Sequence, residues 1–403
     1  MSVPSPSLRD VRLIHTSDWH LGRSFHQVGL LDAQAAFIDH LVDTVRAEAV
    51  DAVLVSGDVY DRALPAPDTV ALLSEAVTRL TDAGAQVVLS SGNHDSAIRL
   101  GFASGLLERS GLHIRSATSS IGRPVLVDGV AIYPLPYLEP SIAAGPLGAA
   151  ERTHAGVLTA AMDRVNADRS VRGGRSVVMA HAFVNGGATS DSERDITVGG
   201  VAMVHPRVFD GVDYVALGHL HGQQQLAETI RYSGSPVAMS FSEARHTKGS
   251  WLVDIEPSGV RSEQVAAPVL RPLAVLRGEL AHLLEHASHA DAERSWCQVT
   301  LTDAVRPMGA MEQLRRRFPH TLALQFDPQR APVAVGSYAA RVAQKSVADV
   351  CCDFLSHVRA GQGATEAEQA VIAEAVEAAR LSMAGHDDEG EVVRAAGRTA
   401  GVA

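Results

Sequence analysis

Five short apolar segments in the first 221 residues each end in side chains that can bind a metal ion or carry a proton. In chain order they read LIHTSDWH, LVSGDVYD, VLSSGNHD, VVMAH and VALGHLH. Short runs rich in β-branched residues that alternate with helical stretches predict a layered α/β sheet buried on both faces. In such sheets the carboxyl ends of the strands build the functional site. We therefore expect these polar strand endings to carry the chemistry of the protein.

The alternation of strands and helices continues to about residue 267, which predicts one large α/β unit over residues 1–267. Helices are predicted over 31–49 and 67–84, and the second ends at Gly84, a candidate C-cap. The predicted strands are 11–17, 52–56, 86–90, 176–180 and 213–218, followed by a more antiparallel pair at 230–235 and 250–256.

A smaller α+β unit is predicted over residues 268–335, because strands alternate there with helices expected at about 279–290 and 308–318. This unit is too short to be a second copy of the first one.

The remaining chain predicts a helical pair within residues 336–385, with helices at about 338–358 and 366–384. Thr365 and Glu368 form a capping-box pattern at the start of the last helix, and each helix carries one apolar stripe. The tail, 386–403, has the composition of a disordered segment.

Composition limits the compartment and the partners. No stretch approaches the 18 or so apolar residues of a membrane span, and the N-terminal residues lack the pattern of a signal peptide. The cysteines are Cys297, Cys351 and Cys352, which form no disulfide framework and favour a reducing, cytoplasmic location. The net charge of −11 argues against a generally basic nucleic-acid-binding surface, but it leaves room for DNA held at a local patch or at metal ions.

The strand endings together supply two Asp, one Asn and four His as candidate ligands, with His94 left over. The seven ligands are Asp18, His20, Asp58, Asn93, His181, His219 and His221. Oxygen and imidazole donors without thiolate suit Mn²⁺, Fe²⁺ or Zn²⁺, and seven donors suit two ions that share a carboxylate. Two such ions hydrolyse phosphate esters. Glycines beside three of the endings, Gly57, Gly92 and Gly218, permit the tight backbone that lets ligands converge.

Each of these motifs has a simpler interpretation when it stands alone. G-D-x-x-D is commonly a turn, and a single histidine after VVMA is more often a core or loop residue. Five such endings in this order within one α/β unit favour a metal centre over five coincidences.

The motifs D-x-H, G-D, G-N-H-[DE], H and G-H-x-H occur here complete and in order between residues 18 and 221, and the chain thereby resembles the calcineurin-like metallophosphoesterase superfamily. The wording HTSDWHLG, GDVYD, GNHD, ALGHLH and YSGSP is similar to the SbcD family of bacterial nuclease subunits. The resemblance is specific over about residues 1–250 and only architectural from there to about 385. It implies a β-sandwich flanked by helices, a small α+β capping domain that recognises DNA, and a C-terminal helical pair.

The resemblance also implies roles for the candidate residues. Asp18, His20, Asp58 and His221 would surround one ion, and Asp58, Asn93, His181 and His219 the other. His94 would face the scissile phosphate as a charge stabiliser or general acid, and Asp95 would orient His94 or a ligand histidine. Asp61 stands where some relatives have a second catalytic histidine, so its role stays open.

For substrate and partners, the resemblance implies exonuclease action on DNA ends and endonuclease action on hairpins and single strands, with Mn²⁺ as the expected metal and Mg²⁺ as the alternative. It also implies a homodimer, with helix 68–83 and its Leu72, Leu73 and Val77 as a candidate interface. An SbcC-type ATPase with a coiled coil would bind the C-terminal helices, and this chain has no G-x-x-x-x-G-K-[ST] of its own. Candidate phosphate contacts are Arg23, Arg62, Arg99 and Lys248.

Two alternatives remain open. The first is a phosphoprotein phosphatase or another phosphodiesterase on the same scaffold, because GDVYDR partly resembles G-D-x-x-D-R-G, although Ala63 replaces the last glycine. The second is a scaffold without activity that binds DNA ends or the ATPase. Such a scaffold is expected to have lost a ligand or His94, and this chain has kept them all.

Overall fold

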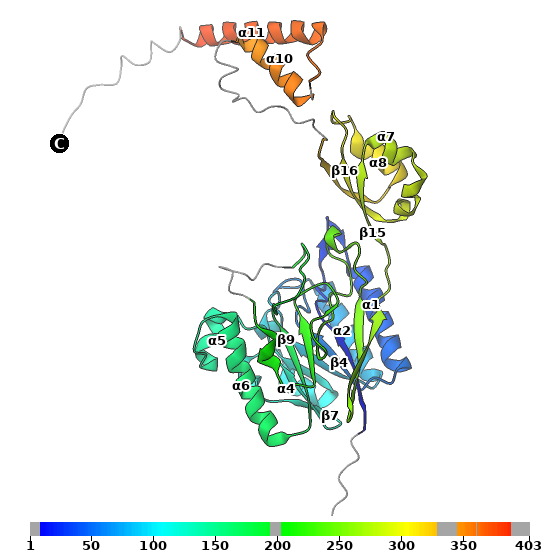
Figure 1. The fold of residues 1–403 in the computed structure, drawn as a ribbon, viewed down its shortest axis with the longest axis vertical. Helices are drawn as coiled ribbons and strands as arrows, with labels where there is room; N and C mark the ends of the chain where they lie inside the picture. The colour runs from blue at the N-terminus through cyan, green and yellow to red at the C-terminus, as the bar shows by residue number, and fades with distance from the viewer. Residues whose placement is uncertain (1–8, 194–202, 329–344, 360, 388–403) are drawn as a thin grey trace, which may run out of the picture. The chain divides into compact units, whose positions relative to one another are not determined.

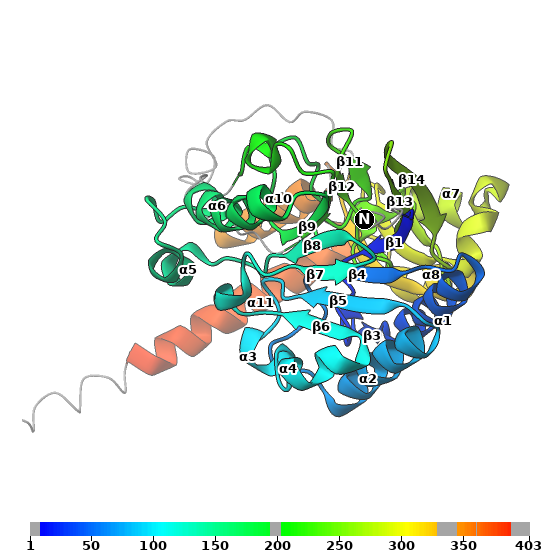
Figure 2. The same cartoon turned by 90° about the horizontal axis from the view of Figure 1, so that it is seen from below.

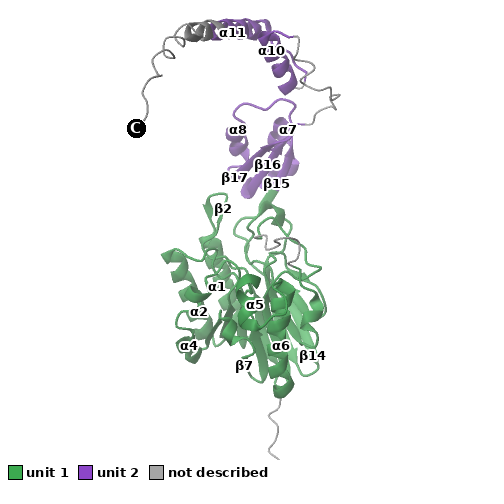
Figure 3. Ribbon diagram, turned by 90° about the vertical axis from the view of Figure 1, so that its left-hand side faces the viewer, with its two compact units in different colours: residues 1–274 green, residues 275–403 purple. Residues whose placement is uncertain are grey.

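The computed structural model of the chain describes residues 9–193, 203–328, 345–359 and 361–387. The chain forms two compact units, Met1–Ala274 and Val275–Ala403, shown in green and purple in Figure 3. Figure 1 follows the elements along the chain. Within the described residues, the helices are too short or too polar to cross a lipid bilayer.

Unit 1 is built on two six-stranded sheets. The first has the order β14 (Gly259–Ala266), β13 (Gly249–Glu256), β1 (Val11–Thr16), β4 (Ala52–Ser56), β5 (Gln86–Ser90) and β6 (Leu112–Arg115). The second has the order β11 (Gln224–Gln225), β12 (Ile230–Tyr232), β10 (Tyr214–Gly218), β9 (Arg175–His181), β8 (Val130–Pro134) and β7 (Val125–Val127).

The two sheets pack face to face with helices on both outer faces. Apolar side chains of both sheets, such as Leu54 of β4 and Met179 of β9, share one core. A second core joins the first sheet to α1 (Leu31–Ala47) and α2 (Pro67–Asp82), and a third joins the second sheet to α5 (Pro140–Leu147) and α6 (His154–Arg172). Figure 2 shows the two helix pairs on opposite sides of the sheets. The predicted layered α/β fold is confirmed.

The register of the parallel strands brings the predicted site together. In the first sheet Thr16 pairs with Val55 and Ser56 pairs with Ser90, so β1, β4 and β5 end side by side. In the second sheet Gly218 pairs with His181, so β10 and β9 also end at one level. The carboxyl ends of these five strands are the places where the candidate ligands follow.

Several helices and strands of unit 1 were not assigned from the sequence. They are β2 (Ser24–Phe25), β3 (Val28–Gly29), α3 (Ala97–Leu100), α4 (Ser104–Leu107), and β6, β7, β8, α5, α6, β11 and β14. The two helices that were predicted form as α1 and α2, each ending two residues before its expected end.

Unit 2 contains a three-stranded sheet in the order β15 (Leu273–Gly278), β16 (Trp296–Leu301) and β17 (Thr321–Phe326), with α7 (Leu280–Glu285) and α8 (Ala310–Arg317). The prediction of a single helix over 279–290 is wrong, because α7 ends at Glu285. The backbone of His286 leaves the helical region with ψ of 129°, and its ring accepts a hydrogen bond from the Ser288 amide at 3.3 Å. A 3₁₀ segment, Ala287–Arg294, follows because this cap starts a new turn.

The C-terminal helices of unit 2 are α10 (Val347–Val358) and α11 (Glu366–Asp387). The predicted capping box is confirmed, because Thr365 N donates to the Glu368 carboxylate at 2.9 Å and Glu368 N donates back to the Thr365 hydroxyl at 3.4 Å. Arg359 clamps the same carboxylate with two hydrogen bonds of 2.8 and 3.0 Å. Residues 338–344 of the predicted helix and 388–403 of the predicted tail lie outside the described residues. The three boundaries between the four predicted segments stay predictions.

His15 lies fully buried between the two sheets, where its Nε2 is 3.1 Å from Leu217 O and its Nδ1 is 2.9 Å from the Tyr214 hydroxyl. Burial lowers the pKa of His15 from 6.5 to about 3. Between these values the unfolded chain binds a proton there that the folded chain does not bind, so stability falls as the pH falls.

Between pH 7 and pH 5, the free energy of unfolding of His15→Gln should fall by about 2 kcal/mol less than that of the unaltered chain. The linkage relation gives this size for such a shift in pKa. Urea denaturation at both pH values measures it, and His26→Gln, a change at an exposed histidine, is the control. Equal pH slopes for His15→Gln and the unaltered chain would contradict the assignment.

Candidate metal centre

The structure brings together every ligand that the sequence predicted. Asp18 and His20 follow β1, Asp58 follows β4, Asn93 follows β5, His181 ends β9, and His219 and His221 follow β10. Apart from Asn93, which is partly exposed, all of these side chains are buried. Three overlapping groups of ligand atoms lie within 4.8 Å of one another: Asp18, His20 and His221; His20, Asp58 and His94; Asp18, Asp58 and His181.

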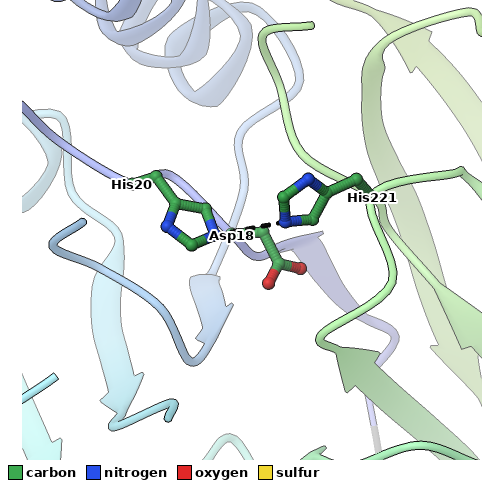
Figure 4. A group of neighbouring side chains, drawn as sticks. All are labelled: Asp18, His20 and His221. Atoms are coloured by element: carbon green, nitrogen blue, oxygen red, sulfur yellow. Dashed lines mark hydrogen bonds between the residues drawn. The ribbon is translucent and has the colours of Figure 1, made fainter. Parts of the chain in front are cut away.

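The first group joins the two sheets. Asp18 and His20 come from the loop after β1, and His221 reaches them from the loop after β10 (Figure 4). The Nε2 atoms of His20 and His221 are 3.1 Å apart. Two nitrogen ligands on one ion, each at about 2.1 Å, have a separation of this size.

The third group contains His181. Its Nε2 lies 2.9 Å from Asn93 Oδ1 and 3.4 Å from Asp58 Oδ2, and Asn93 Oδ1 lies 3.3 Å from His219 Nδ1. The same Asp58 Oδ2 is 3.5 Å from His20 Nε2. Asp58 therefore stands between the two groups, as a carboxylate shared by two ions must.

The backbone at the ligands is strained. The φ angles of Asp18, His20, Asp58 and His219 are 53°, 43°, 48° and 106°, in the region that glycine favours. Non-glycine residues occupy this region at a cost of about 1–3 kcal/mol each, and they cluster at functional sites. The surrounding fold must hold these four residues in place.

The three glycines singled out in the sequence are required by close approaches. A Cβ at Gly92 would lie 2.1 Å from Asp58 Oδ1, one at Gly218 would lie 1.9 Å from Ser56 O, and one at Gly57 would lie 2.3 Å from His181 Nδ1. Each of these distances is far below van der Waals contact, so only glycine lets the strand ends meet.

Three ligand histidines turn one nitrogen toward a second partner. His181 Nδ1 donates to Ser56 O at 2.9 Å, His20 Nδ1 lies 3.5 Å from the Asp61 carboxylate, and His221 Nδ1 lies 2.6 Å from the Ser192 hydroxyl. A ligand histidine is usually oriented in this way, with the other nitrogen left for the metal. The Nε2 atoms here face the ligand groups described above.

The partners of His94 and Asp95 differ from part of what was expected. His94 Nδ1 donates to Asp61 O at 2.8 Å, and its backbone N–H donates to Asp58 Oδ1 at 2.8 Å. The Asp95 carboxylate accepts the backbone N–H groups of Val59, Tyr60 and Gly92 at 2.9–3.0 Å. Asp95 therefore fixes the loop that carries Asp58, which is a different role from orienting an imidazole.

Burial and neighbouring charges compete in setting the pKa values at the centre. Burial alone would raise the pKa of Asp58, but the imidazoles of His181 and His20 outweigh it and hold the pKa well below 3.8. Burial would lower the pKa of His181, but Asp58 and Asp18 raise it to about 9. Burial raises the pKa of Asp18 to about 6. A cation placed among these groups would replace the proton that they now compete for.

The donors present therefore fit two divalent ions of the borderline or hard type. Carboxylate oxygens, an amide oxygen and imidazole nitrogens converge in pairs that are 2.9–3.5 Å apart, within a buried setting. This donor set suits Mn²⁺, Fe²⁺ or Zn²⁺.

Sequence reasoning missed the residues that hold the ligands. Gln34, on the buried face of α1, donates to the carbonyls of Trp19 and His20 at 3.0 and 2.7 Å and so fixes the loop after β1. Its signal was a polar residue among the apolar positions of a helix. Ser192 and Glu243, which lie behind His221, gave no such signal.

The four candidate phosphate contacts have different surroundings. Arg62 is exposed, and the exposed Arg99 donates to Ala63 O at 3.0 Å. Arg23 donates to Asp61 at 3.1 Å and to Ser192 O at 3.0 Å, so it ties two loops of the site together. Lys248 is buried, and its ammonium donates to Glu243, to Ser235 and to a backbone carbonyl. The Lys248 ammonium is therefore already occupied by contacts inside the fold.

Gly92→Ala is expected to destabilise unit 1 by about 1–3 kcal/mol or more, because the new methyl group would overlap Asp58. Gly105→Ala is the matched control, since a Cβ there meets nothing within 4 Å and lies in helix α4. Urea denaturation of both variants measures the difference. Equal free energies of unfolding would show that the loop yields without cost.

Comparisons with known proteins agree with this site. Residues 11–223, more than half of the chain, match the family model of the calcineurin-like phosphoesterases. Residues 269–359 match a second model, SbcD_C, described as the type 5 capsule protein repressor C-terminal domain.

Two solved structures are weakly similar. The protein TT1561 of Thermus thermophilus is 12% identical, with 64% of this chain and 99% of that chain covered and a TM-score of 0.38. GAP50, the anchor in the inner membrane complex of Plasmodium, is 10% identical, with coverages of 81% and 99% and a TM-score of 0.36. No conclusion rests on similarities at this level. The two family matches confirm the expected resemblance to SbcD-type metallophosphoesterases, and the chain belongs to the calcineurin-like phosphoesterase family, whose members hydrolyse phosphoesters with divalent metal ions.

Proposed function

We propose that this chain is the nuclease subunit of an SbcCD-type complex and hydrolyses the phosphodiester bonds of DNA. It would act as an exonuclease at DNA ends and as an endonuclease on hairpins and single strands, in DNA repair and recombination. The observation that carries the proposal is the convergence of five strand endings on one buried set of oxygen and nitrogen ligands, in a chain whose C-terminal part matches SbcD_C.

The ligands divide into two sets that share Asp58. Asp18, His20 and His221 would hold one ion with Asp58, and Asn93, His181 and His219 would hold the other with it. When bound, two such ions, with Mn²⁺ expected and Mg²⁺ as the alternative, lower the pKa of a water and neutralise charge on the phosphoryl group. The fold that holds the strained backbone at Asp18, His20 and Asp58 would also keep these side chains in place before metal arrives.

His94 is the candidate catalytic proton carrier. Its ring stands edge-on to His20 with centroids 4.6 Å apart, and Asp61 O accepts from its Nδ1. This bond turns the ring so that His94 shares a group with His20 and Asp58. From there it would stabilise charge on the scissile phosphate or protonate the leaving sugar oxygen. Asp61 would orient both His20 and His94, which gives this residue a role that the sequence left open.

The proposed partner is an SbcC-type ATPase, and the docking surface would be the C-terminal helices. Val347, Phe354 and Val358 of α10 are each about half exposed and spaced along one stripe, as a coiled-coil contact requires. The capping domain, with Arg62 and Arg99 of unit 1, would contact DNA.

The proposed homodimer would use the region around α2, where the expected Leu73 and Val77 both line a groove. Leu73 lies in the core of unit 1, and Leu72 and Val77 pack against that core. Exposed apolar side chains in this region include those of Ile98 and Phe102, 88% and 81% exposed. They adjoin a groove of about 420 Å³ that α2 lines, and we propose a second copy of this chain as its occupant.

Asp58→Asn should abolish Mn²⁺-dependent cleavage of an end-labelled DNA hairpin, with a loss of more than about 100-fold, because residues around the ligands alone contribute 10–100-fold in such sites. The unaltered chain should leave a phosphopeptide intact. Phosphate release from the peptide with the DNA uncut would favour the phosphatase alternative. DNA binding without cutting at any metal concentration, by the chain together with its ATPase partner, would favour the inactive scaffold.

Phe102→Asp should convert a dimer into a monomer, since a charge in the apolar contact would remain without a partner. Light scattering after gel filtration measures the mass. Ile142→Asp, a change at an apolar residue of α5 that is 73% exposed, is the matched control and should leave the mass unchanged. A monomeric unaltered chain at micromolar concentration would overturn the dimer.

A further inference from the structure

The surroundings of His221 differ from those of the other ligand histidines because its support comes from side chains far apart in the sequence. His221 Nδ1 lies 2.6 Å from the Ser192 hydroxyl, which in turn donates to the Glu243 carboxylate. The second oxygen of Glu243 accepts from Lys248. Glu243 is 1% exposed and Lys248 is 5% exposed, so the whole chain of contacts is buried.

The direction of each hydrogen bond follows from the chemistry of its ends. Glu243 pairs with a buried ammonium group, so it is a carboxylate that can only accept. Ser192 has one hydroxyl proton, which it gives to Glu243, and its oxygen must then accept the proton of His221 Nδ1. This fixes the tautomer of His221 that leaves Nε2 without a proton, and Nε2 is the atom that faces His20 at 3.1 Å.

The main chain of His221 is held by the same cluster. Lys248 donates to His221 O at 2.9 Å, and His221 N donates to the Glu193 carboxylate at 2.8 Å. The carbonyl of Ser192 accepts from Arg23 at 3.0 Å, which fixes the loop that presents the hydroxyl.

We propose that Ser192 and Glu243 are positioning residues for the ion that Asp18, His20, Asp58 and His221 would hold. They act by fixing the tautomer and the direction of the His221 ring. Nothing in the motif set assigns them this role, and the inference rests on the proposed metal centre. A buried Glu–Lys pair is costly, and apolar residues of the same volume would often stabilise a fold as well or better. We call the hydrogen-bonded series from His221 through Ser192 to Glu243 the relay. The ion pair with Lys248 is accounted for because it keeps Glu243 charged as the final acceptor of this relay.

The test is a titration of the full chain with Mn²⁺. Binding is measured by calorimetry and by electron paramagnetic resonance of the bound manganese. The unaltered chain should bind two ions. Ser192→Ala removes the relay but keeps the Glu243–Lys248 pair. It should lower the affinity for one Mn²⁺ ion by about 10–100-fold and leave the affinity for the other unchanged. Ser192→Thr, which keeps a hydroxyl, should restore much of the loss.

Ser242→Ala is the matched control. Ser242 accepts the Asp191 amide at 3.0 Å, so this change loosens the same loop without touching the relay. If Ser192 serves only to anchor the loop, both variants should weaken metal binding alike, and that result overturns the proposal. Glu243→Gln should reproduce Ser192→Ala if it remains folded by circular dichroism.

The failure of the metal centre itself is distinguishable from the failure of the relay. An unaltered chain that binds no Mn²⁺ would overturn the proposed function. Two ions bound with unchanged affinities in Ser192→Ala would overturn the relay alone.

Discussion

Two carboxylates, Asp18 and Asp58, are buried side by side at the ends of neighbouring strands, and the rest of unit 1 is arranged around their charge. An isolated buried carboxylate is expensive, so each must be compensated. The backbone N–H of His219 donates to Asp18 at 3.1 Å and that of His94 donates to Asp58 at 2.8 Å. The Ser17 hydroxyl also donates to Asp18, and the imidazoles of His20 and His181 lie 3.5 and 3.4 Å from Asp58. A site that is compensated in this way keeps its negative charge available for cations, which is the electrostatic requirement of a two-metal phosphoesterase.

The packing of the two sheets explains why the groups that compensate the buried carboxylates come from both sheets. One sheet supplies the loops after β1, β4 and β5, and the other supplies the ends of β9 and β10. The apolar core between the sheets fixes their separation, and His15 joins them through Tyr214 and the Leu217 carbonyl. The close approach at Gly218, where a Cβ would lie 1.9 Å from Ser56 O, leaves no space between the two sets of strand ends. The positions of the ligands are thus set by the core.

The sequence predicts that the candidate ligands converge, because each stands at or shortly after the end of an apolar strand, and strand ends in a parallel sheet meet at one edge. It predicts their support poorly because that support is long-range. The contact of Ser192 with His221 spans 29 residues and that with Glu243 spans 51 residues, and no local pattern marks them. The same limit explains Asp95, whose neighbours in sequence suggested an imidazole partner but whose carboxylate is taken by backbone N–H groups. The break after α7 at Glu285 depends on a local cap that helical periodicity does not reveal.

The two ligand sets differ in how firmly they are supported, and this difference has a consequence for the chemistry. His181 lies at the end of β9 and donates to Ser56 O, a backbone carbonyl of strand β4, so its direction follows from the sheets themselves. His221 depends on a hydroxyl from a loop, a carboxylate from a 3₁₀ turn and an ammonium from the residue before β13. Loops yield more easily than strands. An ion in the proposed His181 set would therefore be held more rigidly, and substitutions around the site would mainly change the affinity of an ion in the proposed His221 set.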